Sequence, residues 1–168
     1  DFVYAEGGND TVIAGEGEGN DFYDGGDGTE DVIKYESANG VVFNLNDGNW
    51  NLAWNLDAGV GMVKSSSAFS ATTGLDVFIR FEKIVGSPGN DVFILHDAGH
   101  WQIDAGAGID FVVFANGLDI LGAEDGPDIR NFEVLDLVTD PTQNIVHFDF
   151  GDFDSIGNAI PLHILGGA

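Results

Sequence analysis

The sequence predicts an all-β protein made of short strands and turns, on two observations. A nine-residue pattern recurs along the 168-residue chain, with a Gly-rich half, one Asp and then an apolar residue. Such a unit contains a tight turn and a very short strand whose apolar side chain points into a core. The second observation is that helical periodicity is poor throughout, while the remaining apolar runs have the length of single strands.

The repeat can be written G-G-x-G-x-D-x-U-x, in which U is a large apolar residue. It occurs as AEGGNDTVI (5–13), EGEGNDFYD (16–24), GGDGTEDVIK (25–34), GSPGNDVFI (86–94) and AGAGIDFVV (105–113), and the opening DFV fits the end of another copy. The expected inward-pointing U residues are Val12, Tyr23, Ile33, Phe93 and Val112. Several copies are imperfect, because Ala5, Glu6 and Ala105 replace glycines and two copies carry extra residues. Five copies that share an Asp and a following apolar residue are nevertheless too many to attribute to composition.

The chemistry of the repeat suits a calcium ion. Glycine permits backbone conformations that turn carbonyl groups inward, and calcium takes about six to eight oxygen ligands from carbonyls and carboxylates. Loops two repeats apart lie on the same edge of the coil, so the expected partners are Asp1 with Asp21, Asp10 with Asp31 and Asp91 with Asp110, at spacings of 20, 21 and 19 residues. We expect about three ions, within a range of about two to five. The residues expected to hold them are Asp1, Asp10, Asp21, Asp31, Asp91, Asp110, Gly8, Gly17, Gly19, Gly26, Gly28, Gly86, Gly89, Gly106, Gly108, Asn9, Asn20 and Asn90. In the alternative interpretation, the Asp residues only cap turns.

These stretches resemble the calcium-binding nonapeptides of the repeats-in-toxin (RTX) or hemolysin-type family of secreted bacterial proteins. YDGGDGTEDVIKYESANGVVFNLNDG (23–48) resembles the family's way of leaving a repeat block, apart from the extra Glu30, and RFEKIVGSPGNDVF (80–93) resembles its way of re-entering one. IRNFEVLDLV (129–138) resembles a segment common in very large RTX-like surface proteins, and the resemblance covers about 110 of the 168 residues. It implies a β-roll and export in an unfolded state by a type I secretion route. The expected fold is a right-handed parallel β-roll or β-solenoid with an irregular insertion.

Four regions are expected in chain order: a calcium-binding repeat block (1–34), inserted strands and a loop (35–83), a second repeat block (84–113) and strands that continue or cap the coil (114–168). The strand-like runs outside the repeats are GVVFNL, GLDVFIRF, FEVLDLV, NIVHFDF and PLHIL, and GDFDSIGN could form one short helical turn. The chain opens on a repeat Asp and closes on GGA, which could begin another copy. We therefore expect a piece of a longer array, because a repeat cannot bury its own core.

The charge excludes several classes of partner. Five Lys and Arg residues stand against 29 Asp and Glu residues, a net charge of −24. Such a surface repels nucleic acid and anionic membranes, and no apolar run is long enough to span a bilayer. There is no Cys, so disulfides and thiolate sites are excluded. Self-repulsion should keep the chain expanded at low calcium concentration, so that it folds outside the cell.

Other site patterns are weak. No Lys follows a Gly cluster as a phosphate loop requires, no loop has EF-hand spacing, and no H-E-x-x-H motif is present. Trp50 and Trp54 would share a strand face and could stack on a sugar, but core packing is the expected role. Because 29 acidic residues guarantee some close pairs, no particular pair indicates catalysis. The histidines are interpreted as structural: His96, His100, His147 and His163.

The expected function is that of a non-enzymatic, calcium-dependent structural module of a larger secreted or cell-surface bacterial protein, such as an adhesin, surface layer or fibre. The alternative is a non-catalytic accessory module of a secreted RTX-type enzyme, such as a serralysin-type protease or an alginate epimerase. Expected partners are calcium, neighbouring repeats or a second copy, and a glycan if the Trp face is exposed. The residues beside U are often apolar and would form a stripe that the rest of the chain or another copy covers: Phe2, Tyr4, Phe22, Val92, Ile94, Phe111 and Val113.

Overall fold

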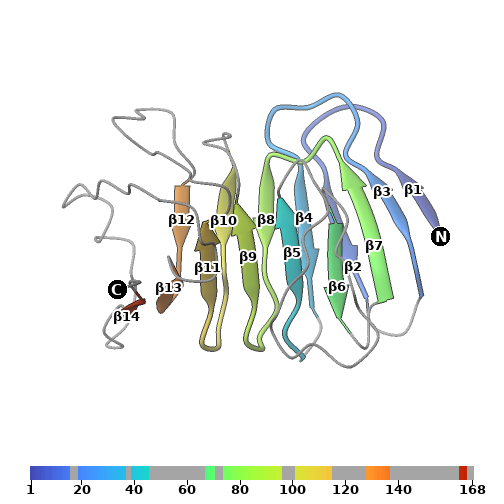
Figure 1. The fold of residues 1–168 in the computed structure, drawn as a ribbon. Coiled ribbons are helices and arrows are strands. Elements are labelled where there is room, and N and C mark those ends of the chain that lie inside the picture. The colour runs from blue at the N-terminus through green and yellow to red at the C-terminus, as the bar shows by residue number, and fades with distance from the viewer. Residues whose placement is uncertain are drawn as a thin grey trace.

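The computed structural model describes residues 1–15, 19–36, 39–45, 67–70, 74–95, 101–114, 128–136 and 163–165. This described part is all-β, as predicted, and contains fourteen strands and no helix (Figure 1). The strands are β1 (Phe2–Tyr4), β2 (Thr11–Ala14), β3 (Phe22–Asp24), β4 (Val32–Tyr35), β5 (Val42–Leu45), β6 (Ser67–Ser70), β7 (Gly74–Ile79), β8 (Lys83–Val85), β9 (Val92–Leu95), β10 (Gln102–Asp104), β11 (Phe111–Phe114), β12 (Asp128–Arg130), β13 (Val134–Asp136) and β14 (His163–Leu165). Within it, no helix is long and apolar enough to cross a membrane.

The strands form two sheets, and the chain passes back and forth between them. The nine-stranded sheet has the order β1-β3-β7-β6-β5-β9-β11-β13-β14, and the five-stranded sheet has the order β12-β10-β8-β4-β2. From β1 to β5, and again from β7 to β13, each strand lies in the opposite sheet to the strand before it. All described pairings are parallel except the two made by β6. A repeat of one turn and one strand produces this alternation, because every second strand returns to the same sheet.

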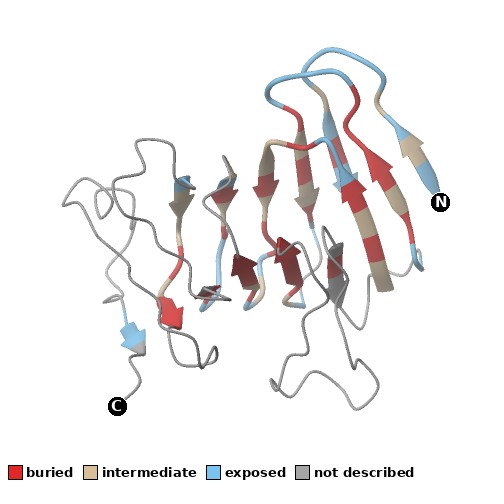
Figure 2. Cartoon of the chain, turned by 45° about the horizontal axis from the view of Figure 1, so that its top comes forward, coloured by how far each residue is buried: buried red, intermediate tan, exposed pale blue. Residues whose placement is uncertain are grey.

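The core lies between the two sheets and is lined by the U residues of the repeat. All five predicted U residues are buried and belong to one hydrophobic cluster that includes residues of both sheets. Phe43 of β5 stacks on Phe93 of β9 with ring centroids 4.6 Å apart, and Tyr35 of β4 meets Phe43 edge-on from the opposite sheet. Figure 2 shows buried positions along the strands of both sheets. The inward direction predicted for U is therefore confirmed.

The region expected as an irregular insertion contributes strands to the nine-stranded sheet. β6 pairs antiparallel with both β5 and β7, and β7 then lies parallel to β3. The register joins Phe22 to Val77 and Tyr23 to Phe78, so β7 takes the place that the next repeat strand would occupy. The segment 46–66, which includes Trp50 and Trp54, lies outside the described residues.

After the second block, FEVLDLV and PLHIL contain β13 and β14 as expected. The strand expected at NIVHFDF and the turn expected at GDFDSIGN lie outside the described residues.

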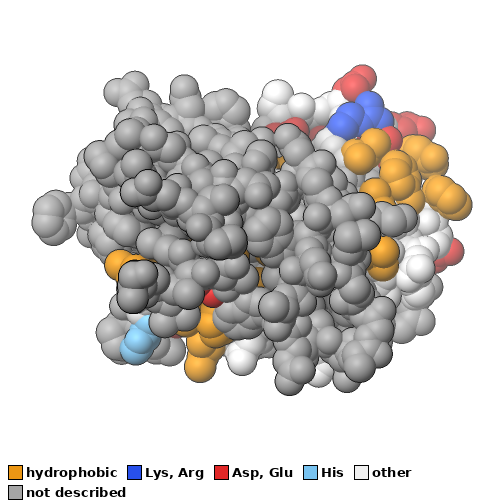
Figure 3. Space-filling model, viewed as in Figure 1, with side chains coloured by type: hydrophobic (Ala, Val, Ile, Leu, Met, Phe, Trp, Pro, Cys, Tyr) orange, Lys and Arg blue, Asp and Glu red, His pale blue; other side chains and the backbone are white. Residues whose placement is uncertain are grey.

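The apolar stripe beside the U residues is covered in the middle of the molecule and open at one end. Ile94 of β9 and Val113 of β11 are fully buried, although they alternate with residues that face the core. At the β1 end, Phe2 is 76% exposed and Tyr4 is 63% exposed, and both rings lie about 6 Å from that of Phe22. Figure 3 shows hydrophobic side chains gathered at this end of the molecule. The chain itself therefore buries part of the stripe.

Candidate metal sites in the Gly–Asp loops

The loops that were expected to pair do lie side by side. Each predicted pair of Asp residues stands directly before two paired strands. The N–H of Asp10 donates to Asp31 Oδ1 at 2.7 Å, and the N–H of Asp91 donates to Asp110 Oδ1 at 2.8 Å. The backbone nitrogen of Asp1 contacts the carboxylate of Asp21 in the same way. We call such a series, in which the N–H before one strand bonds to the carboxylate before the next, an Asp ladder.

Three further acidic residues extend the ladders and were missed by sequence reasoning. Asp76 accepts the N–H of Asp21 at 3.0 Å, Glu82 accepts that of Asp31 at 2.9 Å, and Glu133 accepts that of Asp110 at 2.8 Å. Each stands two residues before a buried apolar residue, namely Phe78, Ile84 and Leu135. The shortened pattern D/E-x-U could have found them, but none is preceded by the Gly-rich half of the repeat.

The ladders leave three buried carboxylate oxygens without a hydrogen-bond partner in the part of the chain that the structure describes. They are Asp10 Oδ2, Asp31 Oδ2 and Asp110 Oδ2, and we call them the unpaired oxygens. The side chains of Asp31 and Asp110 are completely shielded from solvent. A buried carboxylate with a free lone-pair oxygen is costly unless a proton or a cation compensates it. The unpaired oxygens therefore identify where a cation fits best.

Loops 5–10 and 25–31 carry two of the unpaired oxygens and surround an open hollow of about 510 Å³. A Cβ added to Gly28, which lines this hollow, would lie 2.4 Å from both Asp31 Oδ2 and the carbonyl oxygen of Gly8. Oxygens from two neighbouring loops thus converge on a space that exists because residue 28 has no side chain. Carbonyl and carboxylate oxygens in this arrangement suit a hard cation such as calcium.

Arg80 lies at the edge of the same hollow but is bound to another acid. Its Nε and Nη2 atoms lie 2.7 Å and 2.5 Å from the two carboxylate oxygens of Asp24, in a bidentate ion pair. The hydrogen bond from this guanidinium lowers the pKa of Asp24. Asp24 is therefore already neutralised within the protein, and it is not needed as a metal ligand.

Loops 86–91 and 105–110 carry only one unpaired oxygen. Asp91 accepts hydrogen bonds from the N–H of Val41 at 2.6 Å, the N–H of Ser87 at 2.6 Å and the hydroxyl of Ser87 at 2.7 Å. Asp110 Oδ2 has no such partner among the described residues. Burial raises the pKa of Asp91 to about 6 and that of Asp110 to about 7. A cation here would relieve mainly the carboxylate of Asp110.

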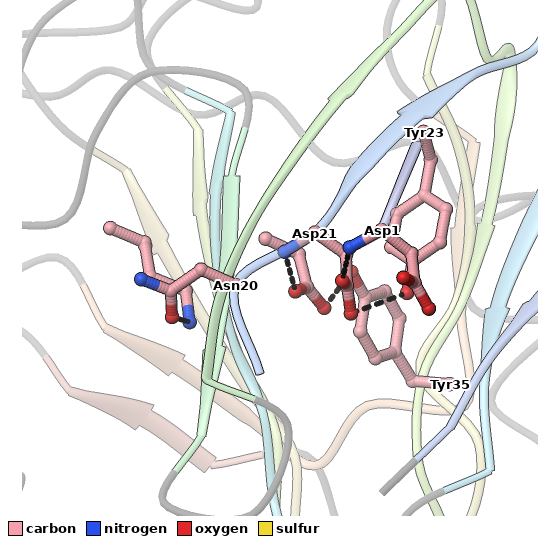
Figure 4. A network of polar contacts seen from close by, with 7 residues as sticks. Asp1, Asn20, Asp21, Tyr23 and Tyr35 are labelled. Carbon is pink, nitrogen blue, oxygen red and sulfur yellow. Dashed lines mark hydrogen bonds and ion pairs between the residues drawn. The ribbon is translucent and has the colours of Figure 1, made fainter. Parts of the chain in front are cut away.

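The predicted pair Asp1 and Asp21 fits a cation least well. The carboxylate of Asp21 accepts a hydrogen bond from the backbone nitrogen of Asp1 with one oxygen and from the Tyr23 hydroxyl at 3.3 Å with the other (Figure 4). Next in the ladder, Asp76 accepts the N–H of Asp21 with one oxygen and the Tyr35 hydroxyl at 3.1 Å with the other. Burial raises the pKa of Asp76 to about 6. Because protein groups already bond to every oxygen of these two carboxylates, a cation has less to compensate.

The Asn side chains join neighbouring loops. Asn90 Oδ1 accepts the N–H of Ile109 at 2.9 Å, and Asn20 Oδ1 accepts the N–H of Leu75 at 3.0 Å. Asn9 Oδ1 accepts the N–H of Thr29 at 3.4 Å. The side-chain oxygens of Asn9, Asn20 and Asn90 therefore each accept one hydrogen bond from a neighbouring loop.

No three His, Cys, Asp or Glu side chains converge anywhere in the described ranges. A cation would consequently take most of its ligands from backbone carbonyl oxygens, with one or two carboxylates. Of the predicted site residues, Gly17 lies outside the described ranges. Of the histidines interpreted as structural, His163 is exposed on β14, and the other three lie outside the described ranges: His96, His100 and His147. Comparisons of the chain with family models, with curated proteins and with solved structures gave no match.

Proposed function

We propose that the chain is a calcium-dependent structural module of a larger secreted or cell-surface bacterial protein. The observation that carries the proposal is the set of unpaired oxygens, which are buried beside Gly-rich loops in a protein of net charge −24. Protein cations cannot balance these acids, because the chain has only five Lys and Arg residues. The resemblance of the repeats to RTX nonapeptides supports the same conclusion.

The fold we propose is a parallel β-roll with an inserted antiparallel strand. Its support is the alternation of the chain between two largely parallel sheets, with the repeat Asp residues in rows at the turns. A right-handed coil agrees with the strong preference of parallel crossover connections for that hand. In such a coil every turn has a neighbouring turn on the same edge, so a cation between two turns would join successive coils.

The geometry favours two calcium ions, the lower limit of the range expected from the sequence. Asp10 and Asp31, with carbonyls such as that of Gly8, would hold one ion, and Asp110 with carbonyls of loops 86–91 and 105–110 would hold the other. Bound calcium supplies the positive charge that these buried carboxylates lack. Extracellular calcium modules bind with a Kd of about 10⁻⁴–10⁻³ M. At ten to a hundred times the Kd, each ion adds about 1.4–2.7 kcal/mol to the free energy of unfolding.

The test is a calcium titration of the chain followed by circular dichroism and calorimetry. Chelation should reduce the β-sheet signal, re-added calcium should restore it, and calorimetry should find about two ions per chain. Magnesium at the same concentration is the control, because it prefers a smaller octahedral shell and keeps its water. A chelated sample with full β-sheet signal and an unchanged melting temperature would contradict the proposal.

A matched pair of variants tests the site itself. Asp31→Asn keeps an oxygen to accept the Asp10 N–H but removes the buried charge, so calcium affinity at the first loop pair should fall about tenfold or more. Glu30→Gln removes a charge from the same loop, but Glu30 is exposed and does not line the hollow, so the affinity should change little. Equal losses in both variants would mean that only net charge attracts calcium.

A further inference from the structure

Two three-residue turns of the same kind stand at the ends of the Asp ladders. Arg80-Phe81-Glu82 joins β7 to β8, and Asn131-Phe132-Glu133 joins β12 to β13. Both begin with a non-glycine residue in the left-handed region, at φ +57° for Arg80 and +60° for Asn131. Both then bury a Phe and end with a Glu. We call them the Phe–Glu turns, and each occupies the position of a longer Gly–Asp loop.

Each Phe–Glu turn holds the last Asp of its ladder by the same set of hydrogen bonds. Around Asp31, the Asp N–H donates to Glu82 Oε2 at 2.9 Å, while the N–H groups of Glu82 and Lys83 donate to the Asp carbonyl at 3.1 Å and 3.0 Å. Around Asp110, the Asp N–H donates to Glu133 Oε2 at 2.8 Å. The N–H groups of Glu133 and Val134 donate to its carbonyl at 3.1 Å and 2.9 Å. Both backbone groups of each Asp are therefore fixed by its turn.

The first residue of each turn is anchored to an acid at the end of a neighbouring strand. Arg80 forms its bidentate pair with Asp24, the last residue of β3. Asn131 Nδ2 donates to Oδ1 of Asp104, the last residue of β10, at 2.7 Å. Together with the buried Phe, this contact attaches each turn to the sheet independently of the Asp that it holds. The turns are thus formed entirely by protein contacts.

The two Asp residues held in this way, Asp31 and Asp110, are the two completely shielded residues that carry an unpaired oxygen. We infer that Glu82 and Glu133 are positioning residues for calcium, an inference that rests on the proposed function. Each Glu holds the backbone of the last Asp in its ladder. That Asp then accepts the N–H of the preceding Asp with one of its carboxylate oxygens and presents its other oxygen to the cation. Partners of a metal ligand affect affinity without touching the metal.

The test measures calcium affinity of the full chain by calorimetry, with Glu82→Ala and Glu82→Gln compared to the wild type. Glu82→Ala removes the acceptor for the Asp31 N–H and should weaken binding at the first loop pair by about tenfold or more. Glu82→Gln keeps a side-chain oxygen acceptor, so binding should stay within about threefold of the wild type. A direct ligand or a simple charge effect would instead make Gln nearly as harmful as Ala, which would overturn the inference.

Two control variants distinguish a failure of this inference from a failure of the proposed function. Glu36→Ala removes a half-exposed carboxylate paired only with Lys34 in the described structure, and it should leave the affinity unchanged. Glu133→Ala should weaken the second site and not the first.

If the wild type binds no calcium, the proposed function fails. If the wild type binds but Glu82→Ala binds equally well, the inference alone fails. Should Glu82→Ala not fold, Glu82→Gln still decides between positioning and ligation.

Discussion

The loop pair of the first repeat block and that of the second follow the same Gly–Asp pattern, but their carboxylates are satisfied differently. In the first pair, Asp10 and Asp31 both keep an unpaired oxygen. In the second pair, Asp91 is saturated by its own loop and the neighbouring one, and only Asp110 keeps an unpaired oxygen. The difference comes from the backbone N–H groups of Val41 and Ser87, which bond one to each carboxylate oxygen of Asp91, and the Ser87 hydroxyl adds a third hydrogen bond. Hydrogen-bond donors of the protein can thus supply part of what a cation would give a buried carboxylate.

The largest expected effect is on the order in which the two loop pairs unfold when calcium is withdrawn. The first pair has more uncompensated charge, so backbone amides in 5–36 should lose protection at a higher residual calcium concentration than those in 84–95. Hydrogen exchange followed by mass spectrometry at stepwise lower calcium measures this order. Simultaneous loss, or earlier loss in 84–95, would show that the hydrogen bonds of Ser87 do not distinguish the blocks.

The second largest effect should be a pH dependence of the stability of the metal-free protein. Burial raises the pKa of Asp110 to about 7 from the ordinary 3.8, so between these values the folded state binds a proton that the unfolded state lacks. Asp110 therefore contributes most to the free energy of unfolding below about pH 4, and its contribution should fall by about 3 kcal/mol as the pH rises to about 7. Asp110→Asn should remove this contribution and leave those of Asp76 and Asp91, whose pKa values burial also raises, and thermal melts in calcium-free buffer would measure the difference. A wild-type melting temperature that rises across this range would contradict the expectation.

A smaller effect is expected when the hollow of the first loop pair is filled. Gly28→Ala would place a methyl group 2.4 Å from the carbonyl oxygen of Gly8, and it should cost about 2 kcal/mol and weaken calcium binding. Gly7→Ala is the matched control, because its nearest contact would be an ordinary 3.5 Å to the Asp27 carbonyl. Urea denaturation at saturating calcium measures both. Equal costs would mean that the crowding of oxygens around Gly28 is unimportant.

The smallest effect should come from Ser87 itself. Ser87→Ala removes the hydroxyl that donates to the buried carboxylate of Asp91 and accepts the N–H of Gly89, and it should lower the free energy of unfolding by about 1.5 kcal/mol, with or without calcium. Thr29→Ala, at an exposed position in the first block, should change it by less than about 0.5 kcal/mol. If added calcium fully restored the stability of Ser87→Ala, the cation and the hydroxyl would be interchangeable at this loop.

The sequence could predict what the repeat itself determines. A turn–strand unit of nearly constant length brings every second copy to the same edge, so the pairing of Asp10 with Asp31 and of Asp91 with Asp110 follows from counting residues. The burial of residues such as Ile33 follows from alternation along each short strand.

Other features depend on contacts between distant parts of the chain. The antiparallel path of β6 has no local pattern, and it hides the ladder position of Asp76 because no Gly-rich half precedes this residue. The hydroxyls of Tyr23 and Tyr35 reach the ladder only after the two sheets have packed together. Residue spacing therefore does not show which carboxylates keep an unpaired oxygen, whereas the completed fold does.

The detour through β6 also has a geometric consequence. Between β7 and β9 the nine-stranded sheet contains β6 and β5, while in the opposite sheet β8 and β10 are direct neighbours. At about 4.8 Å per strand, one face of the molecule is about 10 Å longer than the other over this interval. Two faces joined strand by strand accommodate such a difference by bending, with the shorter face inside the curve. Further strands stacked on β1 and on β14 would then extend in different directions. This part of the protein would form a bend rather than a straight spacer.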